Sequence, residues 1–453
     1  MVRRHLAEES VLFVSVLKWA AFASIIGVVV GASTMLFLKA LDWAGRGTAG
    51  IPYFYLILPV ALMLSNFLAE VIAKDAAGEG LDKVIESVHG HYGKVGFWVG
   101  PAKFITSVIT ITGGGSVGKE APPVQVGAAL ISSASRLLKM DKTDQRKLVI
   151  CAISAGFASV FGAPIAGAIF GIEALFLGQL LYDVILPAFI SGIVAYQVSL
   201  SFGITYFSRD VTIIPVFSSG FFFKVVAAGM AFGLVSLMLV EAMRLAGYLF
   251  GRIKLSFPMK GALAGLILLG ATMLLGDRQY LGLGMNTIER AALGGHVPPF
   301  AFLVKIAFTA VSLGSGASGG IITPIFFIGA TSGNMLGGLI GLDPSTLAGI
   351  GVVSVLAGAA NTPIAAAMLA VELFGVKVGP WAAAAAVVSY LMTGNRSIHS
   401  CQVVASMKSA SIHVPFNMNI GDAADEIKVH VREKSALGLA SRLYKGAKSR
   451  LHK

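Results

Sequence analysis

Charged residues are scarce in this sequence. Only 13% of its 453 residues are Asp, Glu, Lys or Arg, whereas about a quarter are charged in a typical soluble domain. Hydrophobic residues make up 56% of the chain, and apolar stretches long enough to cross a hydrocarbon layer of ~30 Å recur along most of its length. This composition excludes a string of soluble domains and predicts an all-α polytopic membrane protein.

Cysteine is almost absent, and so are the motifs of metal and nucleophile chemistry. The two cysteines, Cys151 and Cys401, lie in or beside apolar segments, so a disulfide framework is excluded. His89 and His91 lie in a polar stretch without metal-ligand spacing. Neither H-E-x-x-H nor a nucleophile elbow occurs in the sequence. We therefore expect no enzyme activity, no metal and no cofactor.

The net charge of +12 does not indicate a nucleic-acid partner. Basic residues gather at Arg3 and Arg4, in the run 136–147 and in the tail 428–453, next to apolar segments. Lys and Arg are enriched in this way at the cytoplasmic ends of membrane helices, and the tail is placed to contact anionic lipid. The first apolar stretch, 11–41, is too long for a signal-peptide core and is expected to be a membrane helix.

The chain carries signs of an internal duplication. The stretch F-G-A-P-I-A-G-A-I-F-G-I-E ends on Glu173, and A-N-T-P-I-A-A-A-M-L-A-V-E ends on Glu372. Pro363 of the second stretch lies 199 residues after Pro164 of the first, and another proline pair upstream is separated by 202 residues. Alanine- and glycine-rich helices also match by chance, but two landmarks in the same order favour a duplication. Glu173 and Glu372 are expected to cap or brace helices.

This pattern predicts two membrane repeats between two short tails. Within the repeats, candidate membrane segments such as 147–177 and 345–375 are interrupted by Gly and Pro, as in the broken helices that form transporter binding sites. A basic helical tail is expected from residue 421 onward. The expected parts are an N-terminal tail 1–10, a first repeat 11–205, a second repeat 206–415 and a C-terminal tail 416–453.

The stretch 113–128, G-G-G-S-V-G-K-E-A-P-P-V-Q-V-G-A, contains most of a phosphate-binding loop but does not fit one. Glu120 stands where that loop needs Ser or Thr, and no strand precedes it. Glycines instead allow the backbone to unwind, and Pro122 and Pro123 suit the first turn of a new helix. Free amides at such a helix start form an anion site. The stretch 314–324, G-S-G-A-S-G-G-I-I-T-P, predicts a second helix start, although small residues also serve close helix packing.

Glu120 is the main candidate for function in the first stretch. An ionisable residue in a membrane segment costs roughly 2.5–3.5 kcal/mol on insertion scales, and such residues are usually functional. Its carboxylate can occupy the place of a bound anion and leave it on protonation. The alternative is a structural ion pair with Lys119 or Lys103.

These motifs resemble those of the CLC family of chloride channels and proton/chloride exchangers. G-K-E-A-P-P-V-Q-V-G is similar to the family signature G-[KR]-E-G-P-x-V-Q-x-G, and G-G-I-I-T-P is similar to its G-x-F-x-P element. The segment 77–88, A-G-E-G-L-D-K-V-I-E-S-V, is similar to its first element, G-S-G-I-P-E-V. The resemblance covers residues 12–405. It implies an inverted repeat with broken and re-entrant helices, a homodimer with one anion path per subunit, and cytoplasmic termini in the cell (inner) membrane.

The resemblance also assigns roles to particular residues. Glu120 matches the external gating glutamate of the family. Ile321 and Ile322 match the positions whose amides hold the central anion, and Gly118 and Lys119 of the signature are expected beside it.

Other positions depart from the family pattern. Lys103 matches an intramembrane lysine, but Glu79 stands in place of the central serine and His399 in place of the central tyrosine. Ala174 replaces the internal proton-transfer glutamate of the exchangers, and Asp82 replaces a proline.

Glu79 and His399 change the chemistry expected at the centre of the path. An ionised Glu79 would repel an anion 4 Å away by ~4 kcal/mol at an effective dielectric of 20. We therefore expect it to be protonated, paired with His399 or turned away; a place at the cytoplasmic mouth is the alternative. A charged His399 would attract the anion, whereas a neutral one would be a hydrogen-bonded packing residue.

The sequence thus predicts transport of a small inorganic anion, with chloride as the best guess, through proton-coupled exchange. Glu120 would be the gate, and Glu79 with His399 would form an internal proton path in place of the glutamate missing at residue 174. Passive CLC-type conduction is the alternative, because channel members of the family lack that glutamate. A cation or amino-acid transporter that uses the two carboxylates as ligands fits less well with two glycine-opened helix starts.

Overall fold

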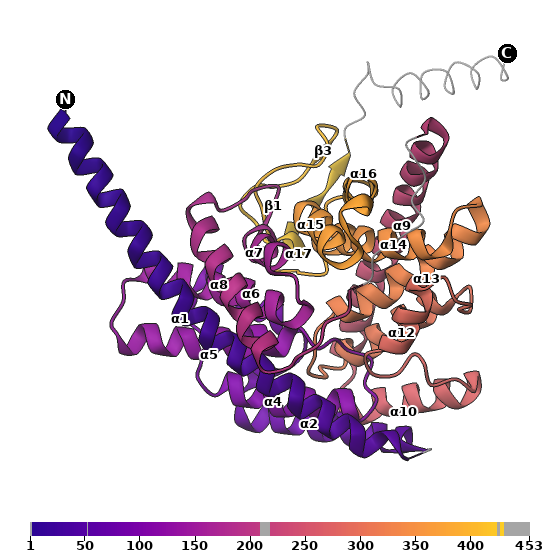
Figure 1. The fold of residues 1–453 in the computed structure, drawn as a ribbon. Helices are drawn as coiled ribbons and strands as arrows, with labels where there is room; N and C mark the ends of the chain where they lie inside the picture. Colours follow the sequence, from indigo (N-terminus) through magenta and orange to yellow (C-terminus); the bar gives the residue numbers. More distant parts are fainter. Residues whose placement is uncertain (1, 52, 209–217, 424–425, 430–453) are drawn as a thin grey trace, which may run out of the picture.

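The chain folds into a bundle of helices with almost no sheet (Figure 1). The computed structural model describes residues 2–51, 53–208, 218–423 and 426–429. The α-helices are α1 Val2–Ala49, α2 Leu58–Ile72, α3 Gly80–Gly90, α4 Val99–Thr112, α5 Ala121–Leu137, α6 Lys142–Phe161, α7 Pro164–Glu173, α8 Ile185–Ser201, α9 Ser219–Arg252, α10 Phe257–Leu275, α11 Met285–Ala292, α12 Ala301–Gly314, α13 Ile322–Ile340, α14 Pro344–Ala360, α15 Pro363–Phe374, α16 Gly379–Met392 and α17 Ile420–Ala423. The two strand pairs are β1 Phe176–Leu177 with β2 Val403–Val404, parallel, and β3 Ile412–His413 with β4 Lys428–Val429, antiparallel.

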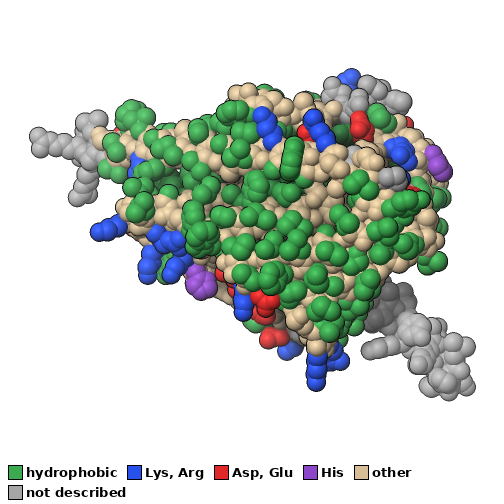
Figure 2. Space-filling view, turned by 90° about the horizontal axis from the view of Figure 1, so that it is seen from below, with side chains coloured by type: hydrophobic (Ala, Val, Ile, Leu, Met, Phe, Trp, Pro, Cys, Tyr) green, Lys and Arg blue, Asp and Glu red, His purple; other side chains and the backbone are tan. Residues whose placement is uncertain are grey.

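Within the described residues, five stretches of helix are long and apolar enough to cross a membrane. They are Glu8–Thr48, Phe54–Ile72, Tyr182–Ser201, Ser219–Arg252 and Phe257–Leu275. Figure 2 shows one face of the molecule on which hydrophobic side chains cover the middle, while charged side chains gather toward the upper and lower edges. This distribution suits contact with lipid in the middle and with water at the edges. The all-α polytopic prediction is confirmed.

The broken segments consist of two helices each. Segment 147–177 divides into α6 and α7 at Gly162, and 345–375 divides into α14 and α15 at Asn361. Both break residues have positive φ, 70° and 57° respectively, the left-handed conformation that ends a helix. Pro164 or Pro363 then starts the next helix, because proline suits a first turn. Each half therefore contains a short buried helix, α7 or α15, instead of one long span.

The two short helices cap each other through the glutamates of the repeated stretches. Glu173, at the end of α7, accepts hydrogen bonds from Ile364 N at 3.1 Å and Ala365 N at 2.8 Å, the first amides of α15. Glu372 of α15 accepts equivalent bonds of 2.9 and 2.8 Å from the first amides of α7. A carboxylate at a helix N-terminus satisfies free amides and the helix dipole. The predicted bracing role is confirmed, and the reciprocity supports the duplication.

The chain ends differ in part from the prediction. Helix α1 begins at Val2, so the helix extends into the predicted N-terminal tail. In the predicted helical tail after residue 421, residues 424–425 and 430–453 lie outside the described part. Within the described part, Lys428–Val429 is not helical: it is a strand that pairs antiparallel with Ile412–His413.

Candidate anion site

Two unwound segments, one from each half, meet inside the protein. Residues 113–120 separate α4 from α5, and residues 315–321 separate α12 from α13. Gly118 N donates to Gly320 O at 2.6 Å, and Gly320 N donates to Gly118 O at 2.9 Å. Because both segments lead directly into a helix, this pairing brings the starts of α5 and α13 together. The two glycine-opened helix starts predicted from the sequence are confirmed.

Glu120 occupies the start of α13. Its Oε1 accepts a hydrogen bond from Ile322 N at 2.6 Å, and its Oε2 accepts bonds from Thr323 N at 3.3 Å and Thr323 Oγ1 at 2.8 Å. The side chain is only 2% exposed. A negative oxygen pair on the free amides of a buried helix start stands where a free anion would bind. Any side chain at Gly118 or Gly320 would clash with this carboxylate.

These contacts speak against a purely structural ion pair. No ion pair within the described part of the chain joins Glu120 to Lys103 or Lys119. The Lys103 ammonium instead donates to Gly78 O at 2.5 Å and Ala76 O at 3.2 Å. Glu120 is therefore held by backbone amides and a hydroxyl, which are groups that an anion can also use.

The other predicted anion-binding residues lie around this centre. The Gly118 amide is engaged with Gly320 and is not open to an anion. Lys119 is partly buried, and its side chain lines two cavities. Ile321, at the N-cap of α13, lines a third cavity on the other side of Glu120.

The cavities on the Lys119 side form an approach to Glu120. A small cavity of about 30 Å³ contacts Lys119, Val160 and Thr323. A wider hollow of about 670 Å³ shares Lys119 and Val160 with it and also borders Lys39 and Arg46. Asp42 also lines the hollow and pairs with Arg46 at 2.6 Å, so Lys39 and Lys119 supply the excess positive charge that favours anions.

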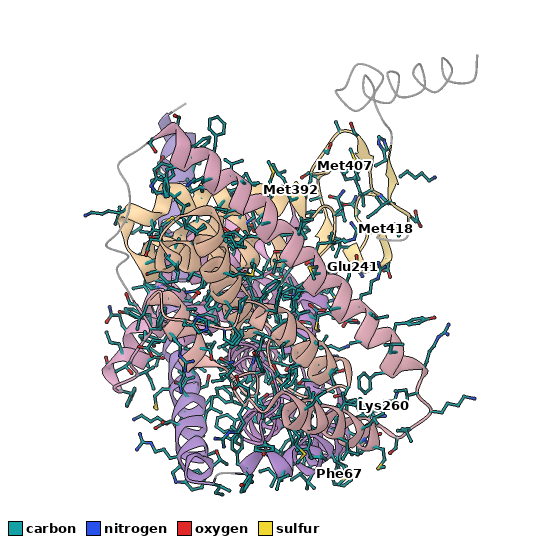
Figure 3. All side chains as sticks on the ribbon, turned by 90° about the vertical axis from the view of Figure 1, so that its right-hand side faces the viewer. Phe67, Glu241, Lys260, Met392, Met407 and Met418 are labelled. Carbon is teal, nitrogen blue, oxygen red and sulfur yellow. The ribbon has the colours of Figure 1, made fainter. Side chains whose placement is uncertain are left out.

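A separate cavity of about 220 Å³, here called the C-terminal cavity, shares no described lining residue with these two and reaches Ile321 at the start of α13. Its lining includes Glu79, Asp82, Glu241, Arg244, Ile321 and Arg396. Figure 3 labels Glu241 on α9, and Arg396 Nε contacts Glu241 Oε1 at 2.6 Å. The two approaches border Thr323 and Ile321, the neighbours of Ile322. The Ile322 amide, which holds the Glu120 carboxylate, thus lies between residues that border two different cavities.

Glu79 lies at ion-pair distance from His399, one of the arrangements predicted, but its hydrogen-bond partner is Asp82. It is the N-cap of α3, and its Oε2 accepts a hydrogen bond from Asp82 N at 2.7 Å. His399 Nδ1 lies 4.0 Å from Glu79 Oε2, which is too far for a hydrogen bond, but 2.9 Å from Asp82 Oδ1. A proline at residue 82 would lack the amide that Glu79 uses. Asp82, which the sequence showed only as a departure from the family's proline, thus supplies the contact to Glu79 and the contact to His399.

His399 is completely buried, and one of its ring nitrogens is unused. Asp82 binds Nδ1, and its other oxygen accepts from Ser400 N at 3.3 Å and Ser400 Oγ at 3.2 Å. His399 Nε2 has no partner in the described part of the structure. Glu120 is close enough to act on the imidazole electrostatically. The ring is therefore held by Asp82 through Nδ1, with Nε2 left unpaired in the described part of the structure.

Ligand atoms of Glu79, Asp82 and His399 lie within 4.8 Å of one another, a spacing that a metal ion can fit. However, Glu79 already caps α3, and Nδ1 already contacts Asp82. The trio is therefore better described as a hydrogen-bonded group than as a cation site.

Thr323 is a site residue that sequence reasoning missed, although it lies in the quoted stretch G-G-I-I-T-P. We predict that Thr323→Val raises anion flux by about fivefold, because losing the buried hydrogen bond from Thr323 Oγ1 to Glu120, about 1 kcal/mol, weakens the hold on Glu120. The longer bond of 3.4 Å that Oγ1 accepts from Lys119 N is lost as well. Thr331→Val is the control, since Thr331 is equally buried on α13 but bonds Phe327 O of its own helix. Flux into liposomes measures both variants. Equal flux in both would remove Thr323 from the gate.

Comparison with known proteins finds related sequences over most of the chain. Residues 56–394 match the family described as "Voltage gated chloride channel". A "Chloride/fluoride channel protein" of Pseudomonas syringae pv. tomato is 36% identical over 439 residues, which is 95% of each chain. An "H(+)/Cl(-) exchange transporter ClcA" of Citrobacter koseri is 28% identical over 387 residues, covering 78% of this chain and 80% of the relative.

Solved structures share the fold. A "CLC-type fluoride/proton antiporter" superposes with a TM-score of 0.82 at 25% identity and covers 86% of this chain and 98% of its own. A "slow cyanobacterial Cl-/H+ antiporter" gives 0.71 at 21% identity, covering 83% and 94%. The relatives are integral membrane transporters and channels of small anions rather than enzymes.

Proposed function

Because the chain belongs to the voltage gated chloride channel family, we propose that it exchanges a small halide ion for protons across the membrane, with Glu120 as the gate. The observation that carries the proposal is the Glu120 carboxylate on the amides of Ile322 and Thr323, between approaches from two sides. Chloride is the first candidate for the anion.

Protonation of Glu120 would open the path. An ionised carboxylate holds the amides of α13 by charge-assisted hydrogen bonds, whereas a neutral carboxyl binds them more weakly. The protonated side chain therefore leaves, and a halide takes the free amides. Deprotonation returns the carboxylate and displaces the halide. One proton thus accompanies each opening.

His399 and Glu79 would form the internal proton path, on the side of the C-terminal cavity. They would replace the internal glutamate of the exchangers, which is Ala174 in this chain. With Nδ1–H bonded to Asp82, the ring gains a second proton at Nε2, next to the path. The imidazolium then donates to an arriving anion, and Asp82 offsets its charge. In this arrangement Asp82 is a positioning residue for His399.

Anion preference should arise from backbone amides rather than from the side chains of α13. Ile321 and Ile322 are fully buried, and their side chains pack in the hydrophobic core. We predict that Ile322→Phe changes the transport rate several-fold but leaves the preference for anions over cations intact, because the helix start keeps its amides. Reversal potentials in a salt gradient measure this preference. A shift toward cation selectivity in Ile322→Phe would refute the amide argument.

Fluoride is the second candidate for the anion. Two of the similar proteins carry fluoride in their names, and the central serine and tyrosine hydroxyls of the chloride-transporting pattern are replaced here by Glu79 and His399. The deciding experiment uses proteoliposomes with an outward gradient of chloride or of fluoride, an ion-selective electrode and simultaneous recording of external pH. Exchange predicts that either halide moves protons uphill. Halide flux without proton movement would instead establish the passive channel.

The resemblance also leads us to propose a homodimer in the cell (inner) membrane, with both termini on the cytoplasmic side. The start of α1 and the β3 segment both lie toward the top of the molecule in Figure 1. Protease cleavage of a terminal tag in sealed, inside-out vesicles tests this orientation, because an external terminus would be protected.

A further inference from the structure

A lysine anchors the segment that follows His399 to the helices. Lys408 is partly buried, and its ammonium donates to Asn361 Oδ1 at 2.5 Å and to Tyr390 O at 2.7 Å. It also lies 3.9 Å from the centroid of the Tyr390 ring, a cation–π distance. Figure 3 labels Met407, the residue before it. Among the described residues no carboxylate pairs with Lys408, so neutral oxygens and an aromatic ring hold this cation.

Asn361 passes this contact on to Gln402. It is the break residue at the end of α14, with a φ of 57°, a conformation that asparagine adopts more readily than most residues. Its Nδ2 donates to Gln402 Oε1 at 2.8 Å and to Arg396 O at 3.0 Å. An ammonium can only donate, so Lys408 requires the oxygen of the Asn361 amide on its side. The lysine thereby turns the NH₂ group of Asn361 toward Gln402.

Gln402 connects this break to the turn that carries His399. Its side chain is completely buried, and its Nε2 donates to Ala174 O at 3.0 Å and to Ala360 O at 3.1 Å, at the ends of α7 and α14. Its backbone N donates to His399 O at 3.1 Å. The turn 399–402 is therefore fixed to one helix of each half.

The position of this turn matters because the His399 ring has a single partner. Asp82 binds Nδ1, and Nε2 is unpaired in the described part of the structure. A ring held at one atom can tilt about that contact unless its backbone is also fixed, and Gln402 supplies the second point. The same turn shapes the C-terminal cavity, since Ser400 O accepts from Gly421 N at 3.0 Å and both residues line that cavity.

We propose that Lys408 is a positioning residue for His399 and acts through Asn361 and Gln402. These three residues are here called the Lys408 latch. The proposal rests on the proposed role of His399, whose Nε2 must face the anion. Without the ammonium, the Asn361 amide loses its charged partner and can turn over, so Gln402 loses a hydrogen bond to a fixed neighbour. The turn then loosens, and Nε2 is no longer kept in place.

The latch acts through position rather than through charge. The charged groups that face His399 are Asp82, Glu79 and Glu120, and all three remain when Lys408 is replaced. A change in how His399 responds to pH in such a variant therefore reports where the ring lies.

Lys305 provides a matched control. It is also a buried lysine, and it donates to Tyr280 O at 3.0 Å and to Gly282 O at 2.7 Å. Its ammonium lies 5.2 Å from the ring centroid of Phe327. Lys408→Met and Lys305→Met thus each remove a cation held by two oxygens and an aromatic ring, but only Lys408→Met breaks the latch.

Halide flux in proteoliposomes, recorded as the pH on the side of the C-terminal cavity falls, measures the rise that protonation of His399 produces. We expect Lys408→Met to reduce this rise at least about fivefold, as the loss of one buried hydrogen bond does to a two-state equilibrium. Lys305→Met should keep the rise in full. In a His399→Tyr background, Lys408→Met should change the pH profile no further.

The two ways to fail are distinguishable. An equal pH profile in Lys408→Met and Lys305→Met overturns the proposal even if both variants transport slowly, because a lower rate alone is what a structural lysine would produce. Persistence of the rise in His399→Tyr overturns instead the role of His399 on which the proposal rests.

Asn361→Gly tests the latch in case Lys408→Met does not fold. Glycine adopts the positive φ of this break without strain, so the helix end is kept while the amide between Lys408 and Gln402 is removed. Asn417→Gly is its control, because Asn417 also has a positive φ, 59°, but is exposed and outside the latch. The rise should shrink in Asn361→Gly and remain in Asn417→Gly. If both variants show the same rise, the latch does not position His399.

Discussion

Replacing Glu120 with Gln should abolish proton movement while halide flux continues. Glutamine has the shape of the protonated side chain but cannot release a proton, so the proposed gate loses its coupling. Its amide also lacks the charge that strengthens the bonds to Ile322 and Thr323. We expect proton flux to fall by at least about a hundredfold, the lower range for removing a proton-transfer group. Simultaneous pH and halide electrodes on proteoliposomes record both fluxes.

Glu173→Gln is the matched control for this change. Glu173 is also buried and also holds two amides at a helix start, those of Ile364 and Ala365, but it braces α15 and borders none of the cavities that lead to Glu120. Glu173→Gln should reduce stability and retain proton coupling. Proton movement that persists in Glu120→Gln would exclude Glu120 from the mechanism.

The helix starts around Glu120 could be predicted because their signals are local. Glycine runs followed by Pro122 or Pro324 predict the start of a helix, and this signal does not depend on the surrounding structure. The duplication could also be predicted, since the spacing of its landmarks is written in the chain. Even the bracing role of Glu173 and Glu372 followed from their equivalent positions, and the structure shows each carboxylate on the other half's helix.

The contacts within the site could not be predicted, because they join residues far apart in the sequence. Asp82 and His399 are separated by 317 residues, and Thr323 and Glu120 by 203. No local pattern indicates such a pair, so the sequence suggested Glu79 as the partner of His399, whereas packing places Asp82 there. The interruptions of 147–177 and 345–375 were predicted from their Gly and Pro, but the residues at which the helices break, Gly162 and Asn361, were not.

Anion flux from the side of the C-terminal cavity should rise as the pH on that side falls through the range in which imidazole titrates. The charged groups that face His399 are Asp82, Glu79 and Glu120, and all three favour the imidazolium, which can donate from Nε2 to the anion. One linked proton allows at most about a tenfold change per pH unit. His399→Tyr offers a hydroxyl that stays protonated throughout, so its flux should lose this imidazole-linked rise and keep only the pH response of the Glu120 gate.

Variants of Asp82 and Glu79 test whether His399 binds the anion only when it is protonated or is a structural packing residue. Asp82→Asn keeps a hydrogen-bonding group near Nδ1 but removes the charge that favours the imidazolium, so the rise in flux should move to lower pH. Glu79→Ser with His399→Tyr restores the hydroxyl pair of the family and should transport halide without the pH response. Each single change of that pair should be slower than the double, because it leaves one buried polar group unmatched. If His399→Tyr, Asp82→Asn and the double variant all keep the original pH dependence, His399 is a structural residue. Passive anion conduction then describes the protein better than proton exchange.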